Sequence, residues 1–110
     1  METKFNFNVT KKDIFNAKTA SISVKDVLNE TLTATGCFVA VNEGIRKGTG
    51  ETCDIGYIST NRGVIGFSSE VAISAIEAFS EYLADVNEPV EIKFTEHAGK
   101  NGNYYTFEIV

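Results

Sequence analysis

Hydrophobic and polar residues alternate along several short stretches of this chain, whereas one stretch in its second half has a longer period. The longer period occurs in residues 69–86, where apolar side chains recur at spacings of three and four, which predicts one amphipathic helix. Five stretches have the alternating or β-branched pattern of strands: residues 31–41, 52–58, 63–67, 90–95 and 104–109. The predicted buried stripe of the helix is Ala72, Ile76, Phe79, Leu83 and Val86.

Local signals mark the ends and bends of these elements. Ser69 is a good cap for the start of the helix. Gly36, in the middle of a long strand, predicts a bulge, and Asn101-Gly102 predicts a hairpin turn. The glycines within residues 42–51 predict a mobile loop.

The predicted order of strand, strand, strand, helix, strand, strand is that of a mostly β, OB-like five-stranded barrel. Its helix lies between the third and fourth strands. Ahead of the barrel, residues 4–9 alternate and predict a half-buried strand or an arm along a sheet edge. We therefore expect a single OB-like domain over residues 1–110, in which residues 1–28 form an N-terminal arm that packs on the barrel.

Composition supports one folded domain, with 43% hydrophobic residues and a single proline in 110 residues. No apolar run reaches membrane-spanning length, and residues 1–10 lack the hydrophobic core of a signal peptide. We expect a cytoplasmic protein (in the host cell cytoplasm if it is viral) with no membrane partner. Cys37 and Cys53 lack companion ligands at metal-site spacing, so we expect two reduced thiols and no metal.

The pattern offers little material for an active site. His97, the single histidine, lies beside a predicted turn and has no nucleophile or metal partner near it in sequence. The glycine-containing stretch 44–50 lacks the GxxxxGK[ST] pattern of a phosphate loop. We therefore expect no enzymatic activity and no cofactor.

The net charge of −5 argues at first against a nucleic-acid partner, but the charge is unevenly distributed. Residues 68–89 hold five acidic residues and no lysine or arginine, so the remaining chain has ten basic and ten acidic residues. An acidic helix on one side of the barrel leaves the other side free to be locally basic.

Single-stranded nucleic acid is held by cations that follow the phosphates and by aromatic rings on which bases stack. Tyr104 is out of phase with Tyr105 and Phe107, which are predicted core residues, so its ring should face outward. For each aromatic residue the alternative is ordinary core packing. The candidate DNA-binding residues are Arg46, Lys47, Tyr57, Arg62, Phe67, Lys93, Lys100 and Tyr104, with Lys11, Lys12 or Lys18 as further cations from the N-terminal segment.

Four segments carry a resemblance to a known family: IFNAKT at 14–19, the lead into the first barrel strand at 29–34, GVIGFSSEVAI at 63–73 and GKNGNYYTF at 99–107. They resemble the IFNAxT segment, the first-strand lead, the G-x-x-aromatic-x-x-S-x-x-V junction and the KGNxFFxL ending of the single-stranded DNA-binding proteins of phi29-like bacteriophages.

The resemblance implies an OB-like barrel that binds single strands regardless of sequence and protects displaced strands during phage DNA replication. Its partners would be single-stranded DNA, further copies along the strand and the viral replication machinery. Phe67 corresponds to a family tyrosine that is implied to stack on DNA, whereas no aromatic residue stands where a second family tyrosine falls, near Val41-Asn42. The alternative is a phage interaction protein on the same barrel that binds or inhibits a host protein through its acidic helix.

Overall fold

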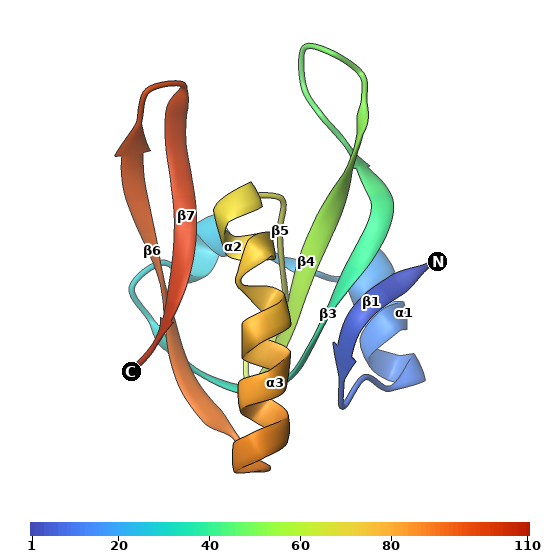
Figure 1. Ribbon diagram of the computed structural model, residues 1–110, viewed down its shortest axis with the longest axis vertical. Coiled ribbons are helices and arrows are strands. Elements are labelled where there is room, and N and C mark those ends of the chain that lie inside the picture. Colours follow the sequence, from blue (N-terminus) through green and yellow to red (C-terminus); the bar gives the residue numbers. More distant parts are fainter.

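The computed structural model describes all 110 residues as one curled sheet with three α-helices and one short 3₁₀ helix (Figure 1). In chain order the elements are β1 (Thr3–Phe7), α1 (Lys11–Thr19), β2 (Ile22–Ser23), the 3₁₀ helix η1 (Val24–Val27), β3 (Thr31–Ile45), β4 (Thr52–Thr60), β5 (Gly63–Phe67), α2 (Glu70–Ser74), α3 (Ile76–Val86), β6 (Val90–Gly99) and β7 (Gly102–Ile109).

The strands follow the order β2-β5-β4-β3-β6-β7, and β1 pairs with β3 beside this path. All neighbours are antiparallel except β2 and β5, which run parallel. The sheet curls into a half-barrel around α2 and α3 (Figure 1). The fold is therefore mostly β and OB-like, which confirms the predicted fold class. The barrel does not close through hydrogen bonds, because the edge strand β7 forms no ladder with β2 or with β5.

β3 is the strand on which the sheet is built, because it pairs with β1, β4 and β6. Its register with β4 shifts at Gly36, which confirms the predicted bulge. A Cβ atom on Gly36 would lie 2.7 Å from the carbonyl oxygen of Phe7, so only glycine lets the N-terminal strand approach this closely.

The prediction of a loop from residue 42 was wrong in extent, because β3 continues to its partner in β4 as far as Ile45 opposite Thr52. The extension turns at Asn42, whose φ of 56° is left-handed and whose N–H donates to a carboxylate oxygen of Asp54 at 3.0 Å. This hydrogen bond holds the pKa of Asp54 below its usual range. The β3–β4 hairpin is consequently a long ordered arm rather than a loop.

The predicted single helix is divided at Ala75 into α2 and α3. Ser69 precedes α2, but its hydroxyl makes no cap hydrogen bond and bonds to the backbone of Tyr105 in β7 instead. The acidic residues of the helix are exposed, as predicted. The predicted stripe is confirmed. Val86 is half-buried, and the other four members are buried: Ala72, Ile76, Phe79 and Leu83.

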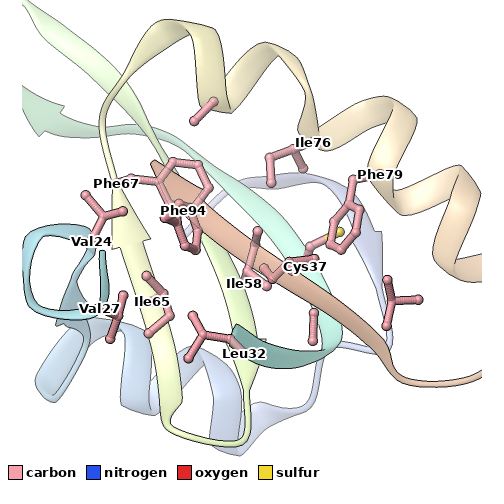
Figure 2. Close-up of a cluster of buried hydrophobic side chains, with 14 of the residues drawn as sticks. Val24, Val27, Leu32, Cys37, Ile58, Ile65, Phe67, Ile76, Phe79 and Phe94 are labelled. Carbon is pink, nitrogen blue, oxygen red and sulfur yellow. The ribbon is translucent and has the colours of Figure 1, made fainter. Parts of the chain in front are cut away.

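The core inside the half-barrel contains three buried phenylalanine rings, Phe67, Phe79 and Phe94 (Figure 2), and the partly buried Phe107 packs against them. The ring centroid of Phe67 lies 5.5 Å from that of Phe94 and 6.3 Å from that of Phe107. The rings of Phe107 and Phe79 pack edge to face, with their centroids 5.1 Å apart. These contacts join β5, β6, β7 and α3, so side chains close the seam that the backbone leaves open.

A second, smaller core lies on the outer face of β3, β4 and β5, where α1 covers the sheet. α1 begins with a capping box, because Thr10 and Asp13 bond reciprocally to each other's backbone N–H. The pattern analysis did not identify this helix. Its buried residue Ala17 packs with Phe38, Ala40, Tyr57 and Val64.

The last hairpin turns one position earlier than predicted, at Lys100-Asn101 rather than at Asn101-Gly102. Gly99 pairs with Gly102, which belongs to β7 and has a φ of +113°. A glycine tolerates this left-handed conformation directly after a two-residue turn. The correction moves Lys100 to the tip of the hairpin.

Replacing Phe79 by alanine should destabilise the fold by about 3–5 kcal/mol, because the buried ring contacts Phe107 and leaves a cavity when it is removed. Glu77→Gln, on the exposed face of the same helix, should leave stability within about 0.5 kcal/mol. Urea unfolding curves of both variants test this, and equal stability of Phe79→Ala and the parent would contradict the assigned core.

The two cysteine residues should differ sharply in reactivity. Burial raises the pKa of the Cys37 thiol from 9.0 to about 12, while Cys53 is half-buried. A thiol reagent at pH 8 should modify one cysteine in the folded protein and two in denaturant, and Cys53→Ala should abolish the native reaction.

Between pH 9 and about 12 the folded state holds the Cys37 proton that the unfolded state loses, so the free energy of unfolding should fall as pH rises. Native labelling of Cys37 at the rate seen in denaturant would overturn this assignment.

Candidate nucleic-acid interface

A surface groove of about 700 Å³ follows the open seam between β5 and β7. Its walls are η1, the tip of the β3–β4 hairpin, the β5–α2 junction and the β6–β7 hairpin. The two hairpins stand as upright arms on either side of α2 (Figure 1). Because no ladder joins β5 to β7, this part of the half-barrel remains open at the surface.

Ser69 fastens the seam below the groove. Its hydroxyl donates to the carbonyl oxygen of Tyr105 at 2.9 Å and accepts from the N–H of the same residue at 3.3 Å. The side chain thus supplies both hydrogen bonds that a strand neighbour would have made. The cap role that the sequence predicted for Ser69 was wrong, because β7 takes the hydroxyl instead.

The groove is basic although the protein is acidic. Its charged lining residues are Lys25, Arg46, Lys100 and Glu70, which give it a net charge of +2. The whole chain carries −5. The acidic residues of α3 do not line it, so the fold separates the two signs of charge in space.

Arg46 is held across the groove by an ion pair with Glu70, with 2.7 Å between Nη2 and Oε1. The hydrogen bond to this carboxylate raises the pKa of the Arg46 guanidinium further above its usual value. Both side chains are largely exposed, so the pair is weak and can exchange for another anion. Arg46 is therefore positioned over the groove and partly neutralised there.

Tyr104 lies at the rim of the groove, and the residue is 37% exposed. It stacks on His97 with centroids 5.2 Å apart and planes inclined by 20°. Nε2 of His97 lies within hydrogen-bonding distance of the hydroxyls of Thr95 and Thr106, at 3.0 and 2.9 Å. These contacts hold two rings as an ordered platform, and they confirm that Tyr104 faces away from the core.

Tyr105 points to the opposite face of β7, toward the groove and the core. Its phenol hydroxyl donates to Glu96 at 3.4 Å. The sequence predicted a pure core residue here, but the ring is only partly buried and lines the groove. Adjacent residues of one strand thus present one ring within the groove and one at its rim.

Two aromatic residues expected on the binding face are buried. Phe67, predicted as a DNA-binding residue, does not lie on the strand surface, because the residue is 4% exposed and its ring packs inside the half-barrel against Phe94. Tyr57 points outward, but α1 covers that face and leaves 6% of the residue exposed, stacked 5.1 Å from Phe38. Burial and the nearby Glu43 carboxylate raise the pKa of the Tyr57 phenol. Neither ring can stack on a base in this structure.

The structure also separates the predicted cations. Arg62 lies in the β4–β5 turn, at the far end of β4 from the groove, and pairs with Glu30. Lys93 lies within β6, opposite Glu108 in the register, and does not line the groove. Lys47 is exposed at the tip of the β3–β4 hairpin, next to Arg46 but outside the lining. Of the predicted cations, Arg46 and Lys100 therefore meet at one site.

Sequence analysis missed one cation of this site, Lys25. It belongs to η1, whose four residues show no period that would place them on a face. The pairing of β2 with β5 brings η1 beside the seam, and this contact depends on the whole chain path. Two local signals in the region were the T-x-x-D capping box that begins α1 and Ser23, whose hydroxyl accepts from the N–H of Lys25 at the start of η1.

Comparisons with protein-family models, with characterised proteins and with solved structures found no match. None of the helices combines the length and apolar composition needed to cross a membrane. No three histidine, cysteine, aspartate or glutamate residues gather into a group that could hold a metal ion.

Proposed function

We propose that this protein binds single-stranded DNA, without preference for sequence, in the groove between its two hairpin arms. The observation that carries the proposal is the charge of +2 gathered around this groove in a chain of net charge −5. Phosphates would contact Lys25, Arg46 and Lys100. A base would stack on the Tyr104–His97 platform at the rim, because exposed rings accept any base by its face.

The geometry also favours a single strand over a duplex. A duplex hides the faces of its bases in the stack, so it could offer the groove only phosphates. Three cations are few for binding by charge alone, and the ring platform would have to supply the remaining affinity. With the resemblance to the phi29-like phage proteins, this supports a role in protecting displaced strands during phage DNA replication.

The alternative function, binding of a host protein through the acidic helix, draws support from a different surface. None of the three ion pairs of the structure involves Glu77, Glu81 or Asp85, so these carboxylates remain open to a partner. The two proposals are separable because the groove and the outer face of α3 share no residue.

Titration of the intrinsic tyrosine emission with poly-dT tests the proposal directly, since the chain has four tyrosines and no tryptophan. If three cations meet phosphates, log affinity should fall against log salt with a slope of about −2, at about 0.7 per contact. Duplex DNA should compete poorly. No change in emission at low salt, or equal competition by duplex, would contradict single-strand binding in the groove.

Removing the exposed ring should weaken this complex more than it weakens the fold. Tyr104→Ala should lower poly-dT affinity by about 1–3 kcal/mol, while Tyr104→Phe, which retains the ring, should bind within about twofold of the parent. Lys93→Ala is a matched control outside the groove. Fluorescence anisotropy with a labelled oligonucleotide measures all three. A loss in Tyr104→Phe equal to that in Tyr104→Ala would contradict stacking.

Releasing Arg46 from its carboxylate should strengthen binding. Glu70→Gln removes the negative charge that lies 2.7 Å from Arg46 and raises the charge around the groove to +3. We expect affinity for poly-dT to rise about two- to fivefold at low salt, the range expected for breaking an exposed ion pair. Adding Arg46→Ala should cancel the gain. An unchanged affinity in Glu70→Gln would show that phosphates do not approach Arg46.

A further inference from the structure

One exposed apolar side chain stands out on α1. Phe15 is 64% exposed. Residues three and four positions away share its helix face, and they include Lys11, Lys12 and Lys18. The single acid of the helix, Asp13, is occupied by the capping box. α1 thus presents a phenyl ring surrounded by three cations.

A surface hollow of about 320 Å³ lies on another part of the molecule, between α3 and β7. Every residue that lines it is apolar: Ala75, Ala78, Phe79, Tyr82, Phe107 and Ile109. Tyr82 and Ile109 are 41% and 44% exposed, so the hollow continues into an apolar rim. Nothing in the chain covers it.

The hollow is bordered by negative charge. Glu77, Glu81 and Asp85 recur every four residues along the exposed face of α3, so they form one row. Asp85 follows Tyr82 by one helical turn, which places the row beside the hollow. None of these carboxylates has an ion-pair partner in the structure.

From this complementarity we propose that the protein associates with itself head to tail, with α1 of one copy docked against α3 and β7 of the next. Phe15 would enter the apolar hollow, and the lysines around it would face the row of carboxylates. The two surfaces match in apolar character and in charge, because an exposed phenyl ring among lysines would meet an apolar hollow beside carboxylates.

A contact of α3 with α3, or of α1 with α1, would be disfavoured, because it opposes like charges. The two surfaces also cannot satisfy each other within one copy. α1 covers the outer face of β3, β4 and β5, whereas α3 covers the inner side of the curled sheet (Figure 1). Each copy in a pair therefore keeps one unused surface, so a further copy can add to the pair.

The contact involves one short helix and one hollow, so it is small and weak in solution. Its strength would depend on salt, since the rim is ionic. Copies that lie side by side on one DNA strand would have a high effective concentration, and the contact would then make binding cooperative. The association itself does not rest on the proposed DNA binding and is tested without DNA.

The experiment uses sedimentation velocity of the full chain at low salt and about 100 μM, with two complementary variants. The first, Lys11→Glu with Lys18→Glu, reverses the charge of α1, and the second, Glu81→Lys with Asp85→Lys, reverses that of α3. The parent should form a concentration-dependent series of oligomers, and each variant alone should sediment as a monomer. Mixed one to one, they should associate again, because the intact α1 of the second variant meets the intact α3 of the first and their two reversed surfaces are also opposite in charge.

Two controls separate this contact from general charge effects. Lys47→Glu with Lys93→Glu changes the net charge as much as the α1 variant does and should still associate. Phe15→Ser should lower the association constant at least tenfold without altering the thermal melting profile. Failure of the mixture to associate, or oligomers in either variant alone, would overturn the head-to-tail contact.

The same variants also test whether the α1 surface binds DNA instead of a second copy. If the parent is monomeric at all concentrations and the α1 variant loses affinity for poly-dT, the lysines and Phe15 contact DNA and the proposal is wrong. If the parent does not bind poly-dT but still forms the oligomer series, the self-association stands and the proposed function falls.

Discussion

The half-barrel depends on the contact between four phenylalanine rings that span its open seam. Backbone hydrogen bonds hold the sheet from β2 through to β7, but they do not join β5 to β7. Phe67 and Phe107 face each other across that gap, with Phe94 and Phe79 packed against them. Apolar burial is not directional, so it can close a seam whose backbone edges are too far apart to pair.

The same constraint creates the candidate binding groove. Where rings and the Ser69 hydroxyl replace a ladder, the surface above them stays open, and η1 and the two hairpin tips form its walls. Lys25, Arg46 and Lys100 come from three segments that are far apart in sequence. The acidic residues are gathered on α3 instead, so a negatively charged chain can present a locally positive site.

The N-terminal segment changes which surface of the barrel is accessible. α1 covers the outer face of the middle strands, and Tyr57 is buried beneath it. The available aromatic surface is thereby shifted to the β6–β7 arm, where His97 and Tyr104 stack. The opposite face of α1, around Phe15, is exposed. Burying one surface of the sheet has therefore created another surface, on the outside of the helix.

Local pattern accounts for the elements that have one regular face. The stripe from Ala72 to Leu83 predicted the buried side of the helix, and alternation in the last hairpin predicted that Tyr104 and Tyr105 point in opposite directions. Alternation assigns a residue to one of two faces, but it does not tell whether another element covers that face. On β4 and β5 both faces are covered, one by the phenylalanine core and the other by α1, so Phe67 and Tyr57 are both buried. The meeting of Lys25, Arg46 and Lys100 likewise depends on long-range strand pairing, because no short stretch of sequence records which segments become neighbours when the sheet curls.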